Sequence, residues 1–222
     1  MLQLKDLFSW SGTLAAELFD RFQDQAPWLI LPEIKAYIQG LQARLSPEDY
    51  LRLSSDVYVH RSAKIAPSAI LQGPSIIGPA VEIRPNSFIR ATALVEANSL
   101  IGYNCELKNV IILPEVQVAH FNYCGDSILG QGSHLACGAI TSNVKSDKSL
   151  VVQHDGDQHY PTGLKKFGAL VGDGVEIGCN SVLNPGTIIG RNARVYPLSS
   201  VRGTVPAKSI YKQNGEIVKI RD

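Results

Sequence analysis

The chain has 222 residues, 45% of them hydrophobic, which is enough for one sizeable core. Its 21 Lys and Arg nearly balance its 20 Asp and Glu, so the net charge of +1 predicts no attraction to nucleic acid or to an anionic membrane. No apolar run is long enough to span a membrane, and the N-terminus lacks the pattern of a signal peptide. Four widely spaced cysteines without a CxxC pair indicate reduced thiols in a cytoplasmic protein.

Residues 1–55 are predicted to form a small helical N-terminal cap. Ser46-Pro47-Glu48-Asp49 has a capping residue, a proline at the first helical position and an acid after it, which is typical of a helix start. Apolar residues at helical spacing form two faces: Leu14, Leu18 and Phe22, then Ile34, Ile38, Leu41 and Leu45.

An aliphatic residue recurs at every sixth position in the middle of the chain. A second run with the same period covers residues 171–201, and Leu129, Leu135 and Thr141 carry the period between the runs in a shifted register. The first run is Val59, Ile65, Leu71, Ile77, Ile83, Ile89, Val95, Ile101, Leu107, Leu113 and Ala119.

A period of six matches neither an α-helix nor a simple strand. It fits a short strand followed by a turn, so that three such sides complete a triangular coil of 18 residues with the aliphatics inside. Residues 56–205 are therefore predicted to be an all-β domain, a parallel β-helix of hexapeptide repeats. A C-terminal hairpin or tail at 206–222 follows, turning at Asn214-Gly215.

The repeat is interrupted twice. The period fails across 120–126, and a second interruption runs over 142–166. We expect both segments to be loops that project from the scaffold, where binding and catalytic groups usually lie.

The first interruption carries a specific motif. His120-Phe-Asn-Tyr123-Cys-Gly-Asp126, followed by Gly138-Ala-Ile-Thr141-Ser-Asn143, resembles the acetyltransferase half of the bacterial bifunctional N-acetylglucosamine-1-phosphate uridyltransferase/glucosamine-1-phosphate acetyltransferases. Upstream, Arg84-Pro85 and Glu106-Leu107-Lys108 resemble two further elements of that family. The resemblance covers roughly 57–205 and implies a left-handed coil, a homotrimer and acetyl-CoA as acyl donor. The family's nucleotidyltransferase domain has no counterpart in residues 1–55, so uridylyl transfer is not expected.

The resemblance also implies roles for particular residues. His120 would be the general base, because an ammonium cannot attack a thioester and imidazole titrates near physiological pH. Arg84 and Lys108 would hold the sugar phosphate, and Tyr123 and Asn143 would contact the sugar or its phosphate. The acceptor would be a hexosamine 1-phosphate in amino-sugar and UDP-N-acetylglucosamine metabolism, and the site would lie between subunits.

Several positions depart from the family pattern. Cys137, Cys179 and Pro197 occupy positions that would contact the coenzyme, and His134 replaces an asparagine. Either Lys165 or Lys166 could match the family's loop lysine. These departures leave two alternatives open: a non-catalytic sugar-phosphate-binding solenoid that partners a separate nucleotidyltransferase, or an O-acyltransferase of a related sugar.

Each assigned residue also has a purely structural explanation. The basic side chains could be solvated, Tyr123 could pack between coils, and the cysteines could be small buried fillers. His154 and His159 have the spacing of two zinc ligands in hexapeptide-repeat carbonic anhydrases. Because they lie outside the repeat in a Gly- and Asp-rich segment, we expect no metal.

Overall fold

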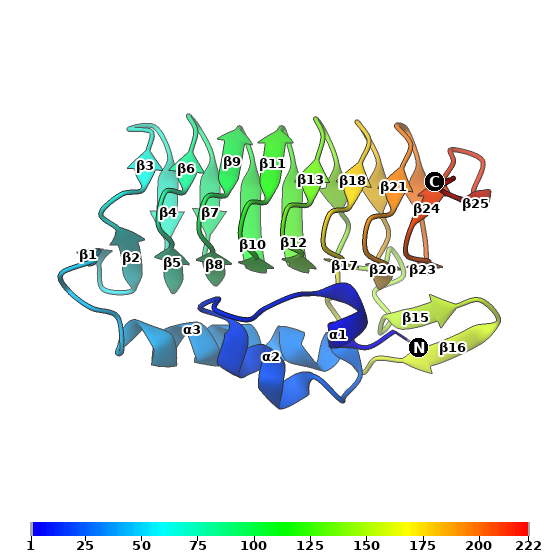
Figure 1. Cartoon of the computed structure of the whole chain (residues 1–222), viewed down its shortest axis with the longest axis horizontal. Helices are drawn as coiled ribbons and strands as arrows, with labels where there is room; N and C mark the ends of the chain where they lie inside the picture. Colours follow the sequence, from blue (N-terminus) through cyan, green and yellow to red (C-terminus); the bar gives the residue numbers. More distant parts are fainter. Residues whose placement is uncertain (1, 222) are drawn as a thin grey trace.

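The computed structural model describes residues 2–221 as a left-handed parallel β-helix with a layer of helices along one side (Figure 1). The coils have three faces. Face 1 consists of β3 (Lys64–Ile65), β6 (Glu82–Ile83), β9 (Leu100–Tyr103), β11 (Gln117–His120), β13 (His134–Leu135), β18 (Glu176–Ile177), β21 (Arg194–Val195) and β24 (Ser209–Tyr211).

The other two faces join into one sheet, because β10 (Glu106–Ile112) and β12 (Tyr123–Leu129) bend around the corner between them. Face 2 contains the first halves of these strands with β4 (Ile70–Gln72), β7 (Phe88–Arg90), β14 (Ile140–Thr141), β19 (Val182–Leu183) and β22 (Ser200–Val201). Face 3 contains the second halves with β2 (Val57–His60), β5 (Ser75–Ile77), β8 (Ala93–Val95), β17 (Ala169–Val171), β20 (Thr187–Ile189) and β23 (Thr204–Val205).

The aliphatics of the repeat form the interior, as predicted. Val59, Ile77 and Val95 are register partners on successive coils and lie in one buried cluster, because every coil between them has its full length. The second run, from Val171 to Val201, lies in the same cluster. The sequence pattern therefore located most of the core.

The register changes earlier than the sequence suggested. The partner of Val95 is Ile112, and Val118 continues the interior, so Leu113 and Ala119 were wrongly assigned to it. Each of two coils is one residue shorter, at corners where Asn109 and Asp126 have positive φ. The segment 120–126 is consequently no projecting loop, since it forms the end of β11, a corner and the start of β12.

The helical segment does not cap an end of the β-helix. Its helices are α1 (Leu4–Leu7), α2 (Ala16–Phe22), the 3₁₀ helix η1 (Pro27–Glu33) and α3 (Ile34–Gln42), and they run along face 3 (Figure 1). Face 3 strands turn their middle residue outward, and these residues are aliphatic and buried against the helices: Ile76, Leu94, Ile111, Ile128, Leu170 and Ile188. Burial of this outer row explains why the layer lies there.

The ends of the coil are closed by strands instead. β1 (Tyr50–Ser54) pairs antiparallel with β2, so Ser46–Asp49 leads into a strand rather than a helix. At the other end, β24 pairs antiparallel with β25 (Ile217–Lys219) across the turn at Asn214-Gly215.

The insertion at 142–166 contains a hairpin of β15 (Val152–Asp155) and β16 (Gln158–Pro161). Its Tyr160 extends the helical layer, since the ring centroids of Trp28 and Tyr160 are 6.3 Å apart. Gln153 Nε2 donates to Thr204 Oγ1 at 2.7 Å, which fixes the hairpin to the last coils. Within residues 2–221, no helix is long and apolar enough to cross a membrane.

Candidate active site

The predicted base and the predicted coenzyme positions lie together on one corner of the coil. The corner between faces 1 and 2, here called the His120 edge, carries His120, Cys137, Cys179 and Pro197 on successive coils. The backbone N–H groups of Gly138, Asn180 and Leu198 donate, each at 2.9 Å, to the carbonyls of His120, Cys137 and Cys179 respectively. Four residues that are far apart in the sequence therefore form one column.

The imidazole of His120 is exposed and makes no hydrogen bond to any other residue between 2 and 221. Its backbone position is firmly held, because the neighbouring Asn122 is buried and donates to the carbonyls of Ala136 (2.7 Å) and Ala139 (3.2 Å). Two aromatic rings lie beside it, those of Tyr103 and Phe121, which meet edge to face at a centroid distance of 5.4 Å. The ring of His120 is thus free to meet a substrate.

A hollow of about 370 Å³ lies on face 2 next to this edge. Phe121 lines it on the side of the edge, and Phe88, Glu106 and Tyr123 line it on the face. The ring of Tyr123 extends along its own strand over Gly125, where a Cβ atom would come within 2.4 Å of the phenol oxygen. Glycine at position 125 is therefore required for this orientation of the tyrosine.

Polar side chains gather around Asp126 at the far edge of face 2. Its buried carboxylate accepts hydrogen bonds from Lys108 Nζ at 3.3 Å, from Asn109 Nδ2 at 3.0 Å and from the amide of Asn143. Asn143 Nδ2 also donates to the hydroxyl of Tyr123 at 3.3 Å. Burial, assisted by the charge of Asp126, raises the pKa of Tyr123, so this hydroxyl stays neutral.

Arg84 does not belong to this group. It forms an ion pair with Glu82 at 3.0 Å and lines a separate hollow on face 1 with Lys64. Arg90 occupies the position expected for a partner of Lys108. The pairing of Phe88 with Glu106 places Arg90 and Lys108 at equivalent positions of successive coils.

Sequence reasoning missed Arg90 because the Arg-Pro dipeptide directed attention to Arg84. The available signal was the repeat itself, since Arg90 precedes Lys108 by one full coil. Arg90 is exposed and pairs with Glu106 at 2.9 Å. The cluster on face 2 therefore contains two cations and two carboxylates.

The remaining predicted residues lie apart from this cluster. His134 pairs with Glu176 at 2.9 Å on face 1, and Lys165 and Lys166 are exposed at the end of the insertion. Cys179 is exposed and Cys137 half-buried, so neither is the buried filler that sequence reasoning offered as an alternative.

The two histidines of the insertion lie beside each other. His154 and His159 lie opposite each other in the β15–β16 hairpin, with ring centroids 4.5 Å apart. Desolvation by burial and the proximity of His159 lower the pKa of His154. Among residues 2–221, no three His, Cys, Asp or Glu side chains are grouped to hold a metal ion.

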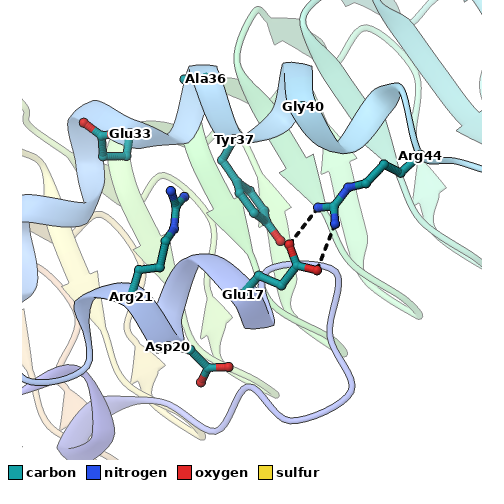
Figure 2. Close-up of a pocket in the computed structure, with 8 residues that line it drawn as sticks. All are labelled: Glu17, Asp20, Arg21, Glu33, Ala36, Tyr37, Gly40 and Arg44. Carbon is teal, nitrogen blue, oxygen red and sulfur yellow. Dashed lines mark hydrogen bonds and ion pairs between the residues drawn. The ribbon is translucent and has the colours of Figure 1, made fainter.

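A larger groove lies elsewhere, between α2 and α3, with a volume of about 580 Å³. Figure 2 shows that its charges face one another: Arg44 makes two hydrogen bonds to Glu17, at 2.9 and 2.8 Å. The guanidinium of Arg21 lies 5.8 Å from the centre of the Tyr37 ring. None of the predicted site residues lines this groove, and its ion pair joins the two helices.

Residues 168–203 match a protein-family model described as bacterial transferase hexapeptide (six repeats). The chain is 31% identical over 190 residues to a bifunctional sugar-1-phosphate nucleotidylyltransferase/acetyltransferase of Sulfurisphaera tokodaii, covering 84% of this chain and 47% of that protein. It is 26% identical over 223 residues to a bifunctional protein GlmU of Methanococcus vannielii, covering 99% of this chain and 54% of that protein. The chain thus spans about half the length of the curated relatives it matches.

Solved structures show a looser likeness. AntD, an N-acyltransferase from Bacillus cereus, aligns over 82% of this chain and 89% of its own, with a TM-score of 0.44 and 16% identity. PerB from Caulobacter crescentus aligns over 73% of this chain and 56% of its own, with a TM-score of 0.36 and 18% identity.

The fold and the repeat define the class: the chain is a hexapeptide-repeat protein with a left-handed parallel β-helix. Within that class, its sequence resembles the bifunctional GlmU proteins, as the motif around His120 suggested.

Proposed function

We propose that the chain transfers the acetyl group of acetyl-CoA to the amine of a hexosamine 1-phosphate related to glucosamine 1-phosphate. The observation that carries this proposal is the exposed, unengaged imidazole of His120, which begins the column of Cys137, Cys179 and Pro197 and precedes Phe121, a residue that lines the hollow on face 2. The resemblance to a sugar-1-phosphate nucleotidylyltransferase/acetyltransferase supports the substrate class.

His120 acts as the general base in this proposal. The sugar amine attacks the thioester carbonyl, the C–N bond forms, and the imidazole takes the proton that the nitrogen loses. Collapse of the tetrahedral intermediate breaks the C–S bond, and the proton passes to the departing sulfur. Positioning of the two substrates side by side supplies much of the remaining acceleration.

Each substrate has a matching surface beside His120. The column from His120 to Pro197 covers three coil spacings, about 14 Å, and gives the extended arm of coenzyme A a strip of small side chains. Across the hollow, Arg90 and Lys108 provide the cations for the sugar phosphate, with Tyr123 and Asn143 beside them. Arg90 replaces Arg84 in the pair that the sequence suggested.

The site is open in one chain and is completed by neighbouring subunits in our proposal. The helices cover face 3, so faces 1 and 2 and the His120 edge between them stay free for contact. Tyr103 and Phe121 leave 39% and 54% of their surface exposed on that edge, which suits an interface. We therefore propose a homotrimer, and sedimentation of the protein as a stable monomer would exclude it.

The test is the loss of thioester absorbance in a mixture of acetyl-CoA, glucosamine 1-phosphate and the protein. We expect turnover by the wild type and a loss of about 100-fold or more for His120→Ala, because general-base catalysis contributes about that much. Arg84→Ala serves as the matched control and should retain turnover. If the wild type shows no turnover and acetyl-CoA does not raise its melting temperature, a non-catalytic solenoid that binds sugar phosphates replaces this proposal.

A further inference from the structure

Cys137 and Cys179 are stacked directly on one another at the His120 edge. The N–H of Ala136 donates to the carbonyl of Ile177 and the N–H of Asn180 to that of Cys137, both at 2.9 Å, so the two cysteines are register partners. Neighbouring strands lie about 4.8 Å apart, which is within the range of about 4.4–6.8 Å between the Cα atoms of disulfide-bonded cysteines.

The environment of this pair differs from that of the other cysteines. Cys179 is exposed and Cys137 is half-buried, whereas Cys105 and Cys124 lie in the interior. Burial raises the pKa of the Cys124 thiol, which keeps it unreactive.

A glycine follows Cys137 at the corner of the coil. Gly138 has a φ of +74° and lies in the corner between β13 and β14, outside both strands. Stacked Cβ atoms are as far apart as their strands, about 4.8 Å, and disulfide Cβ atoms are about 3.8 Å apart, so the bond needs an approach of about 1 Å.

We propose that Cys137 and Cys179 are a site of reversible oxidation that takes up a small-molecule disulfide as oxidant. The Cys179 thiolate attacks the disulfide, whose S–S bond breaks and releases one thiol. Cys137 then attacks the sulfur of Cys179, forms the bond between the coils and releases the second thiol. The two protein thiols lose two electrons to the oxidant, and their protons end on the two thiols released.

The bond would close the strip beside the predicted base. His120 lies one coil before Cys137, and Pro197 lies one coil after Cys179, so the disulfide is in the middle of the column. Formation of the bond does not depend on the proposed function, but inhibition by it rests on that function.

The experiment is to incubate the assembled wild-type protein with oxidised glutathione and to map its peptides without reduction. We expect a peptide pair linked through Cys137 and Cys179, two hydrogens lighter than the thiol form, and its loss after dithiothreitol. Cys105 and Cys124 should stay unmodified and serve as internal controls. Cys137→Ser and Cys179→Ser should each retain glutathione on the remaining cysteine, because no second thiol is present to displace it.

A wild type that carries glutathione separately on both cysteines, or that is linked only between chains, would overturn the proposal. The second measurement is turnover before and after oxidation, with the double variant C137S/C179S compared only with itself. Wild type should lose activity and regain it with dithiothreitol, while the double variant should not respond. If the wild type is inactive throughout, the acyltransfer proposal fails, and the peptide map still decides whether the disulfide forms.

Discussion

Face 3 and the His120 edge are built from the same repeat, yet the outward residues of one are buried and those of the other are exposed. On face 3, outward residues such as Leu94 and Leu170 are completely buried beneath helices. On the His120 edge, Phe121 and Leu198 leave 54% and 60% of their surface exposed. The inward residues of a β-helix therefore hold the coil together. The outward residues determine which surface is covered by the chain's own helices and which remains exposed to substrates or other subunits.

The largest expected effect tests the buried side of this comparison. Leu170→Ala should lower the free energy of unfolding by about 2–5 kcal/mol, because it removes a fully buried side chain from between face 3 and the helices. Phe121→Ala is the matched change on the open edge and should alter it by less than about 0.5 kcal/mol in the monomer. Urea unfolding measures both, and equal losses would contradict the division between the two surfaces.

The second prediction concerns the carboxyl group that joins the helical layer to the coil. Glu96 is buried and accepts the N–H of Ala15 at 2.9 Å at the start of α2, and desolvation raises its pKa from 4.5 to about 7. The folded state therefore binds this proton more tightly than the unfolded state, so stability falls as the pH rises from 4.5 to 7.

The loss of folding free energy caused by ionisation of Glu96 should reach about 3 kcal/mol at neutral pH. Glu96→Gln should remove the dependence, which thermal melts across that pH range would reveal. A wild-type stability that rises through this window and an unchanged slope in the variant would show that Glu96 is not responsible.

The third prediction concerns two arginines on different faces of the coil, Arg90 on face 2 and Arg84 on face 1. Arg90→Ala should raise the KM for the sugar phosphate by about ten- to a hundredfold, because it removes a charge-assisted hydrogen-bond donor. Arg84→Ala should leave KM unchanged, because Arg84 is bound to Glu82 on face 1. The reverse result would restore the assignment made from the Arg-Pro dipeptide.

The smallest effect is expected on the outer surface of the helices. Arg44→Ala breaks the bidentate pair with Glu17, but both side chains are exposed. Such surface pairs contribute little, so the urea midpoint and the turnover should both stay at wild-type values. A clear loss of turnover would connect the groove between α2 and α3 to catalysis.

Sequence reasoning succeeded where a residue's position follows from the repeat alone. Most inward aliphatics were found in this way. His120, Cys137, Cys179 and Pro197 were instead chosen by family resemblance, and the pairing between coils places them in one column. The helices were predicted to cap the β-helix but lie along face 3, because the apolar spacing of a helix does not indicate which surface it packs against. The missing information was nevertheless present, since Ile76, Leu94 and Leu170 each precede an inward residue and would be unusual on a solvent-exposed face.

The two corners that lose a residue account for the other errors. The corners at Asn109 and Asp126 have one residue fewer, which shortens two coils without ending any strand, so the change of register looked like a loop. Arg84 was chosen for a local dipeptide, although the relation of Arg90 to Lys108 depends on the coil length. Pairing between coils, which no local motif encodes, determines which residues share a site.

The helical layer also sets the length of the molecule. A bare solenoid can gain or lose a coil at modest cost, because each coil contacts only its neighbours. Here one continuous segment contacts outer residues from Ile76 near the first coil to Ile188 near the last. The length of the helical segment must therefore match the number of coils, because removal of one internal coil would shift every later contact by a strand spacing. The same tie makes fraying from either end costly, so we expect the chain to unfold as a single cooperative unit.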